Sequence, residues 1–456
     1  MALMTAQQVR DPYALTSADV ENPPRSLATL VRKLGPGIIL AGSIVGSGEL
    51  IATTVLGAEN GYTLLWLIVV SCVIKNIIQN ELGRYAIGTG ETTLEAFDRI
   101  PGPRLGVSWV VWLWVLMIAG TVLTIGAMLG AIGEVLNMLV PAVPINVWTW
   151  LIAAVSVMIL LVGEYGLVEK ISVVLVSYFT LMTVLAGAML VTQPEYFSWG
   201  RVLEGFTFQR PSGGLLTAVA AFGITGAGSV ELFMYPYWCI EKGYARFAGP
   251  RDDSTLWRDR ARGWIRVMGV DIISSMALYT VSTVAFYLLG AGVLFGAGIV
   301  PEGSEMIRSL STMYTETLGD WTQPLFLLGA VIILYSSVFA AAAAHPRMLA
   351  DVAGMLGLYD KHDYRRRLRV THLFVAIYLL LPALCYLFVG EPVIMVKLGG
   401  TAEALLLPVV GFSTIYLRYK HLPRTILPKG WLTLGLWVTS AIMAFMMAYA
   451  IIVPLL

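Results

Sequence analysis

Two glutamates, Glu49 and Glu231, lie in the middle of long apolar segments, and each one closely follows a run of glycines. The first stands in GSIVGSGELIATTVLGA and the second in AFGITGAGSVELFMYPYW. A carboxylate at bilayer depth is costly, so it normally faces a protein-lined cavity and marks a pathway. The glycines indicate that each helix is interrupted, and irregular backbone is tolerated at such depth only where it is buried or lines a cavity. Two interrupted helices with an acid at each break are typical of the ion site of a transporter.

A capping role is the simpler alternative for both glutamates. Each one opens the half-helix that follows its break, where free N–H groups and the helix dipole favour an anion. Two charged caps would meet near the middle of the membrane, and like charges at close range favour protonation of one of them when no cation is bound. The pair therefore also suggests a carboxylate-based proton exchange.

The composition is that of an integral membrane protein and excludes a soluble enzyme, because 57% of the residues are hydrophobic and only 13% are charged. The three cysteines have neither metal-ligand spacing nor a disulfide pattern, so they are interpreted as small core residues. The sequence lacks the GxxxxGK[ST] motif that binds ATP phosphates, so it does not indicate an ATP-driven pump. We expect the lipid bilayer and a transported ion or small solute as partners, with no cofactor, no nucleic acid and no obligate protein partner.

Eleven apolar segments are long enough to cross a bilayer as helices, which takes about 20 residues each, so an all-α fold is predicted. They cover residues 35–58, 61–86, 106–138, 146–163, 167–191, 214–240, 264–295, 321–345, 370–389, 392–416 and 431–454. Residues 1–34 are expected to form a polar tail, residues 35–416 a core of ten helices, and residues 417–456 a loop and the eleventh helix.

Positive charges predict the orientation of the chain in the membrane. Arg and Lys gather in the loops 241–266, 346–369 and 417–430, all on the side of the N-terminal tail, whereas the opposite loop 296–320 is acidic. With eleven spans, this asymmetry predicts a plasma-membrane protein with a cytoplasmic N-terminus and a C-terminus outside.

The two glycine-interrupted segments, the first and the sixth, open two successive blocks of five spans at about 35–191 and 214–416. An odd number of spans per block inverts the second copy. The chain is therefore predicted to be a 5+5 inverted repeat in which corresponding helices, 1 and 6, are broken.

Residues 35–71, GPGIILAGSIVGSGELIATTVLGAENGYTLLWLIVVS, resemble the first two helices of the Nramp divalent-metal transporters. The Gly-Pro-Gly start, the turn from Gly57 to Trp66 and the spacing between them match, and the sixth segment matches more loosely through GSVELFMYPY. The resemblance covers the layout of segments one to ten, with readable motifs in the first, second and sixth. It implies a LeuT-type fold and a secondary transporter that works by alternating access.

The chain departs from the usual metal site of that family at both breaks. Where family members have Asp-Pro-Gly-Asn, residues 46–49 read Gly-Ser-Gly-Glu, and where they have Met-Pro-His, residues 231–233 read Glu-Leu-Phe. The acidic residues that conduct protons in the family are also missing from residues 120–133, so classical proton coupling is expected to be weakened or absent. The resemblance implies a substrate site at the two breaks, with Glu49 and Glu231 as metal ligands. The residues of this predicted substrate site are Glu49, Glu231, Gly46, Ser47, Ser43 and Gly228.

Loss of the methionine predicts a hard cation, because sulfur ligands select softer metals and oxygen ligands suit Mg²⁺, Ca²⁺ or Mn²⁺. Gly46 in place of an aspartate also predicts a wider, purely oxygen-lined cavity for an ion that keeps several waters, as Mg²⁺ does. The predicted substrate is a hard divalent cation, Mg²⁺ or Mn²⁺. One alternative is a non-metal solute, an organic cation or an amino acid, which the aromatic residues Phe233, Tyr235 and Tyr237 would favour. Another is a protein that binds an ion without turnover.

Other charged residues in the apolar segments carry weaker signals. Lys75 and Asp271 are expected to pair with opposite charges across helices, and Lys397 would offset a site glutamate if it pointed inward. His345 is expected at a helix end and not at a metal. The candidates for coupling or gating are Lys397, Glu403, Asp271 and Lys75.

Overall fold

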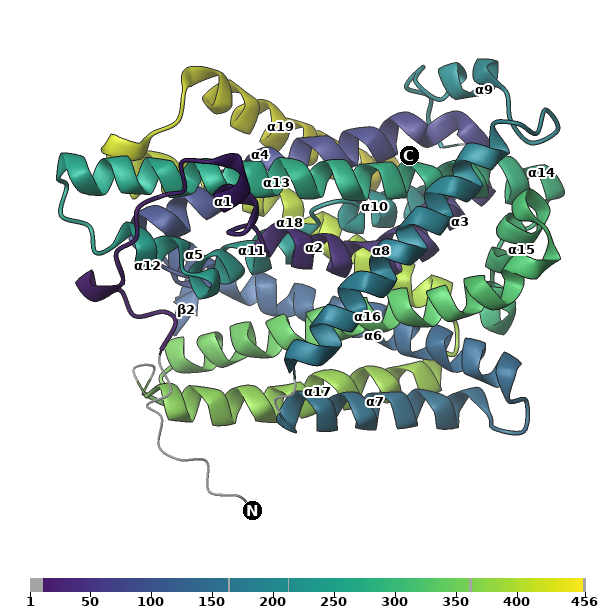
Figure 1. The fold of residues 1–456 in the computed structure, drawn as a ribbon, viewed down its shortest axis with the longest axis horizontal. Coiled ribbons are helices and arrows are strands. Elements are labelled where there is room, and N and C mark those ends of the chain that lie inside the picture. Colours follow the sequence, from purple (N-terminus) through teal and green to yellow (C-terminus); the bar gives the residue numbers. More distant parts are fainter. Residues whose placement is uncertain (1–10, 163–164, 212, 361–362, 454–456) are drawn as a thin grey trace.

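The computed structural model describes residues 11–162, 165–211, 213–360 and 363–453, and this part of the chain is almost entirely helical (Figure 1). The all-α prediction is confirmed, since two strands of two residues each are the exception within these ranges. Most of the long helices run close to the horizontal axis of Figure 1, so the molecule is a bundle with a left and a right end.

The helices follow one another in the order expected from the apolar segments, with short helices in the loops. The first half contains α1 (Leu27–Val31), α2 (Pro36–Ile44), the π-helical stretch η2 (Val45–Thr53), α3 (Thr54–Asn60), α4 (Leu65–Thr89), α5 (Thr93–Asp98), the antiparallel strands β1 (Arg104–Leu105) and β2 (Val107–Ser108), α6 (Trp109–Leu139), α7 (Ile145–Val162), α8 (Tyr165–Leu190) and α9 (Trp199–Glu204). The second half contains α10 (Leu215–Ile224), α11 (Ser229–Lys242), α12 (Tyr244–Ala248), α13 (Thr255–Leu289), the π-helical stretch η4 (Gly290–Leu294), α14 (Phe295–Ala297), α15 (Met306–Leu318), α16 (Gln323–Met355), α17 (Tyr364–Val389), α18 (Pro392–Lys420) and α19 (Gly430–Ile452). Short 3₁₀ turns lie at Ser17–Asp19, Gly61–Leu64, Gly303–Glu305, Asp320–Thr322 and Arg424–Ile426.

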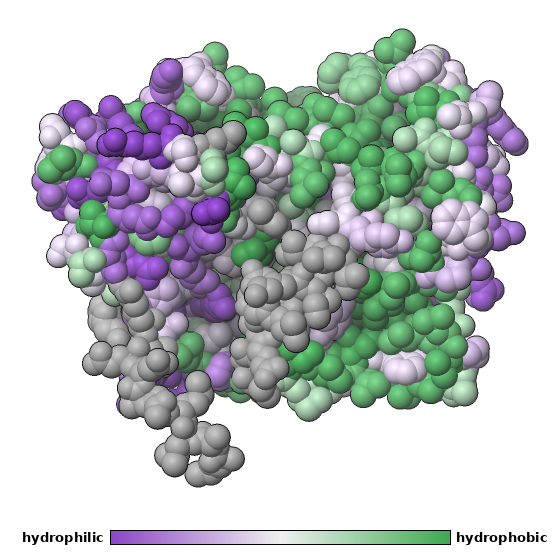
Figure 2. Space-filling view, viewed as in Figure 1, coloured by the Kyte–Doolittle hydropathy of each residue, from purple (hydrophilic) through white to green (hydrophobic). Residues whose placement is uncertain are grey.

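The surface has the apolar band that a bilayer requires. Eight helices of the described part are long and apolar enough to cross a membrane, and shorter apolar helices, Ile145–Leu161 and Thr180–Leu190, coincide with the fourth and fifth expected segments. Figure 2 shows hydrophilic residues gathered at the left end and along the right edge, with hydrophobic residues over much of the surface between them. This distribution is that of a multi-pass membrane protein.

The first apolar segment is interrupted by a π-helical stretch and not by unwound chain. α2 continues through η2 directly into α3. The glycines of η2 lie where neighbours approach closely, because a Cβ atom on Gly46 would lie 2.2 Å from Ser337 Oγ and one on Gly48 would lie 3.2 Å from the Ile224 carbonyl oxygen. π-helical turns are rare and frequently occur at functional sites. The expectation of an unwound first helix is corrected to an irregular but continuous one.

The sixth apolar segment is broken as predicted. α10 ends at Ile224 and α11 begins at Ser229. Between them Gly226 has a φ of 69°, a conformation that glycine adopts without the cost of a side chain. The Gly228 N–H donates to the Gly226 carbonyl oxygen at 2.9 Å, so the break is a defined tight turn.

Small residues bring α18 against the first half of this broken helix. A Cβ atom on Gly223 of α10 would lie 2.1 Å from the Gly400 carbonyl oxygen of α18. Likewise, a Cβ atom on Gly400 would lie 3.0 Å from the Ala220 Cβ. Small residues allow the backbones of membrane helices to approach in this way. The contact carries Glu403, three residues after Gly400 and on the same helix face, to the break.

Candidate functional site

Side chains from α4 hold the break between α10 and α11. Lys75, which is fully buried, donates hydrogen bonds to the carbonyl oxygens of Phe222 at 2.7 Å and Thr225 at 2.6 Å. The hydroxyl oxygen of Ser71, one turn earlier, lies 3.2 and 3.1 Å from the same two oxygens, so its single hydrogen is shared between them. Carbonyls at the end of a helix have no intrahelical partner, so α4 supplies their donors. The expected partner of Lys75, an acidic side chain, is thus corrected to main-chain carbonyls.

Two carboxylates face the same point beside the break. Glu231 lies in the first turn of α11, and Glu403 lies in α18, where its main-chain carbonyl accepts a hydrogen bond from Ser229 Oγ at 2.6 Å. An atom at the missing Cβ position of Gly228 would lie 2.7 Å from Glu231 Oε2 and 3.0 Å from Glu403 Oε2. The Gly223 carbonyl oxygen lies 2.7 Å from the same point, so the absence of a side chain on Gly228 lets these three oxygens converge there.

Glu49 reaches the same region from η2. It is fully buried, and its Oε1 accepts a hydrogen bond from Thr283 Oγ1 of α13 at 2.9 Å. The preceding residue, Gly48, packs against the end of α10, since a Cβ atom on it would lie 3.2 Å from the Ile224 carbonyl oxygen. Both predicted glutamates are thus brought to the break, but Glu231 shares its space most closely with Glu403.

A cavity of about 30 Å³ opens beside Glu231 and Glu403. Its polar lining consists of Thr121, Thr124, Glu231, Ser337, His345, Tyr378 and Glu403. Within the described part of the chain, Glu231 Oε2, Thr124 Oγ1 and His345 Nε2 are buried without a hydrogen-bond partner. Buried polar atoms are normally satisfied, and a cavity of this volume holds a water molecule or a small ion. These atoms therefore mark the cavity as a place for a small polar ligand.

Three carboxyl groups and one ammonium group gather around the break. Glu231, Glu403 and Glu49 all interact with the charge of Lys75, which offsets one of them. Among the residues that the structure describes, no group of three or more His, Cys, Asp or Glu side chains is arranged to hold a metal ion. A cation bound here would complete its shell with hydroxyl oxygens, carbonyl oxygens or water, as hard cations do.

The first interruption contributes less open space than the sequence suggests. A Cβ atom on Gly46 would lie 2.5 Å from the Ser337 Cβ and 3.3 Å from Met128 Sδ. The expectation of a wider cavity at Gly46 is wrong, because Ser337 of α16 and Met128 of α6 occupy the volume that an aspartate would take. The side chains of Ser43 and Ser47 lie outside the described residues.

Two candidates for coupling or gating have partners other than the site glutamates. Lys397 of α18 forms an ion pair with Glu59 of α3, with 2.7 Å between Nζ and Oε1, so it does not offset the site. Asp271 of α13 accepts hydrogen bonds from the main-chain N–H groups of Gly35 at 3.0 Å and Gly37 at 2.6 Å. It therefore caps the start of α2, and its expected partner, a lysine, is replaced by main-chain N–H groups. Gating roles for these two residues stay predictions.

His345 lines the cavity, although the sequence predicts that it lies at a helix end. It lies inside α16 and not at a helix end, and its Nδ1 is hydrogen-bonded to the Tyr378 hydroxyl. The sequence signal for it is a polar side chain directly after a run of five alanines. A buried polar residue in such a run needs a partner on a neighbouring helix. Sequence alone does not identify that partner.

Known proteins resemble this chain over nearly its whole length. The family model described as natural resistance-associated macrophage protein-like (Nramp) matches residues 37–453. An uncharacterized protein of Pasteurella multocida is 25% identical over 428 residues, which are 90% of this chain and 91% of that protein. The divalent metal cation transporter MntH of Deinococcus radiodurans is 24% identical over 380 residues, 78% of this chain and 76% of its own length.

Solved structures show the same architecture. A crystal structure of a mutant of the Eremococcus coleocola manganese transporter has a TM-score of 0.66 at 19% identity, covering 95% of this chain and 90% of the other. A likeness at this identity concerns the fold alone. It confirms the predicted LeuT-type fold, in which two repeats of five helices have opposite orientations.

Proposed function

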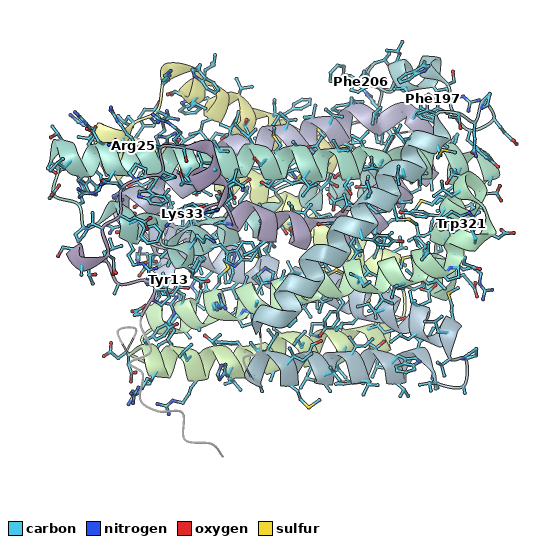
Figure 3. All side chains as sticks on the ribbon, viewed as in Figure 1. Tyr13, Arg25, Lys33, Phe197, Phe206 and Trp321 are labelled. Atoms are coloured by element: carbon cyan, nitrogen blue, oxygen red, sulfur yellow. The ribbon has the colours of Figure 1, made fainter. Side chains whose placement is uncertain are left out.

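The chain belongs to the Nramp family, and on this premise we propose that it is a secondary transporter of a hard divalent cation, Mg²⁺ or Mn²⁺, that works by alternating access. It lies in the plasma membrane with its N-terminus in the cytoplasm and its C-terminus outside. The N-terminal segment with Arg25 and Lys33 lies at the left end in Figure 3. Positive charges favour the cytoplasmic side. We propose no catalytic reaction for it.

The observation that carries the proposal is the pair of carboxylates at the helix break. Glu231 and Glu403 face one point beside a cavity of about 30 Å³. Inverted-repeat transporters bind ions at such breaks, and carboxylates, hydroxyls and water suit Mg²⁺ and Mn²⁺. With Glu49 added and Lys75 subtracted, two negative charges remain when all groups are ionised, and they match one divalent cation.

The choice between the two metals depends on the other cavity walls, which are not purely oxygen as the sequence suggests. His345 and Met128 also line the cavity, and imidazole and thioether groups are softer donors. If either one reaches the ion, it favours Mn²⁺ over Mg²⁺. The relative named as a divalent metal cation transporter supports a divalent cation without distinguishing Mn²⁺ from Mg²⁺.

We further propose that proton coupling is weaker than is usual in the family. α6 presents the hydroxyls of Thr121 and Thr124 to the cavity, and a hydroxyl donates or accepts a hydrogen bond without titrating near neutral pH. A liposome flux assay with a trapped pH reporter measures the coupling. Metal uptake with little or no internal acidification is expected, whereas a fixed ratio of protons to metal would contradict this point.

Isothermal titration calorimetry of the purified protein with Mn²⁺, Mg²⁺ and Ca²⁺ tests the substrate. Glu231→Gln and Glu403→Gln keep the side-chain shape but remove the charge, so each should weaken binding at least about 10-fold, or about 1.4 kcal/mol. The matched control is Glu305→Gln, because Glu305 is an exposed carboxylate that pairs with Arg308. The control should bind like the parent protein. If no divalent cation binds, the metal proposal fails while the family and the fold stand.

The alternative of an organic cation or an amino acid is not supported by the cavity. In this conformation the cavity has about 30 Å³, the space of an ion or a water molecule, which favours an ion as the ligand. The aromatic residues that favour this alternative have other partners. The Tyr235 hydroxyl donates to Asp271 at 3.0 Å and the Tyr237 hydroxyl donates to Asp351 at 2.5 Å. The Phe233 ring packs against Phe97 and Trp114.

A further inference from the structure

Lys75 places a buried ammonium group in a cage of main-chain oxygens. Its Nζ contacts the carbonyl oxygens of Phe222 at 2.7 Å, Thr225 at 2.6 Å and Gly223 at 3.5 Å. The centroid of the Phe222 ring lies 5.3 Å from the same nitrogen, within the range of a cation–π interaction. Every one of these partners favours a positive charge.

The same oxygens would suit a free monovalent cation. They lie at the carboxyl end of α10, where the helix dipole is negative. In transporters with broken helices, carbonyls of this kind coordinate Na⁺. In this chain the position is filled by a side chain that α4 delivers across the helix interface.

The balance of charges around the break also supports a positive charge at the position of Lys75. Glu231, Glu403 and Glu49 all interact with the Lys75 charge. One divalent cation and one ammonium group together balance three carboxylates. Without Lys75, the site with its divalent ion would lack one positive charge, which a monovalent ion could supply.

We propose that Lys75 is a resident cation that occupies the carbonyl cage at the end of α10 in place of a free Na⁺ or K⁺ ion. The protein therefore needs neither ion, and removal of the lysine charge creates a monovalent cation site. The charge count rests on the proposed function. The assignment of the carbonyl cage does not rest on the proposed function, because it follows from the contacts of Lys75 alone.

Thermal unfolding in EDTA, with no divalent ion present, tests this separately from metal binding. Lys75→Met and Lys75→Gln are compared with Lys75→Arg and the parent protein in NaCl, KCl and choline chloride of equal ionic strength. In the Met and Gln variants we expect NaCl or KCl to raise the Tm by about 2 °C or more over choline chloride. In the parent protein and Lys75→Arg we expect no such difference.

The Gln variant separates charge from hydrogen bonding, since its amide N–H₂ still donates to carbonyls. If folded Lys75→Gln matches the parent protein in all three salts, the lysine is only a hydrogen-bonding cap and the proposal is overturned. The same holds if folded Lys75→Met shows no difference between the salts. A variant that can be purified folded only in NaCl or KCl supports the proposal.

The parent protein provides a measurement that does not depend on how the variants fold. Divalent metal uptake into liposomes is recorded with all Na⁺ and K⁺ replaced by choline. Uptake within about twofold of that in NaCl is expected. An absolute requirement for Na⁺ or K⁺ would overturn the proposal. Absence of any divalent uptake would instead count against the proposed function, and the EDTA unfolding series would still decide the role of Lys75.

Discussion

At the scale of single residues, two glycines that look alike in the sequence leave their space to different kinds of neighbour. Gly228 leaves its space to the carboxylates of Glu231 and Glu403, so these two groups can approach each other. Gly46 leaves its space to Ser337, so it closes the packing around the first interruption. A missing side chain therefore enlarges a cavity only where no neighbour moves into the free volume.

This contrast predicts the outcome of restoring the usual aspartate of the family at position 46. Gly46→Asp should destabilise the protein by about 1–3 kcal/mol, because its Cβ would overlap Ser337 and overpacking has costs of this size. Combining it with Ser337→Gly should recover most of that loss. The free energy of unfolding of the two single variants and the double variant measures the coupling. Additive losses would show that Ser337 is not the obstacle.

At the scale of elements, the site depends on how closely α18 approaches α10. The crossing at Gly223 and Gly400 has no room for a Cβ atom on Gly223, and it sets the distance of Glu403 from the break. α10 is also the half-helix whose last carbonyls bind Lys75. One helix pair therefore positions both a carboxylate and the ammonium group of the site.

Enlarging Gly223 should separate the two helices. Gly223→Val places a branched side chain against the Gly400 backbone, which cannot rotate away as a side chain can. A loss of several °C in Tm and at least about 10-fold weaker divalent binding are expected, with Gly223→Ala intermediate. Gly430→Ala is the control, because nothing lies within 4 Å of a Cβ atom built there. Normal binding by the Val variant would mean that the crossing does not position Glu403.

The sequence predicts the elements well and their contacts poorly, for a physical reason. Hydrophobic length locates the apolar helices, and the glycines before Glu231 reveal a break that needs a positive φ at Gly226. The glycines before Glu49 give the same local signal, yet there they serve close packing in a π-helical stretch. The pairing of Glu231 with Glu403 and the place of His345 depend on contacts between distant segments. Local patterns do not encode such contacts.

At the scale of the whole molecule, the N-terminal segment is fastened across the end of the bundle at the left of Figure 3. The Tyr13 hydroxyl donates to Glu241 of α11 at 2.6 Å, and the Arg367 guanidinium of α17 lies 3.9 Å from the centroid of the Tyr13 ring. α11 is the second half of the broken helix. Tyr13 thus links a half-helix of the site to α17, and alternating access requires groups of helices to move against one another.

The Tyr13 contact should hold the N-terminal segment in place and should be insensitive to pH near neutrality. Burial, followed by the charge of Glu241, raises the pKa of the Tyr13 hydroxyl well above its usual value. A group with a raised pKa contributes its full stability below its ordinary pKa of about 10 and loses it as the pH rises through the raised value. The hydrogen bond therefore persists throughout pH 7–9.

Tryptic cleavage after the exposed Arg25 measures how often the segment detaches. Tyr13→Ala should be cut about tenfold faster than the parent protein, because it loses both the hydrogen bond to a charged group and the contact with Arg367. Tyr13→Phe keeps the ring and should fall between the two. The ratio of the Ala and parent rates should stay constant from pH 7 to 9, because dividing the rates removes the pH dependence of trypsin itself. A ratio near one would show that Tyr13 does not fasten the segment, and a ratio that falls across this range would show that another group controls its release.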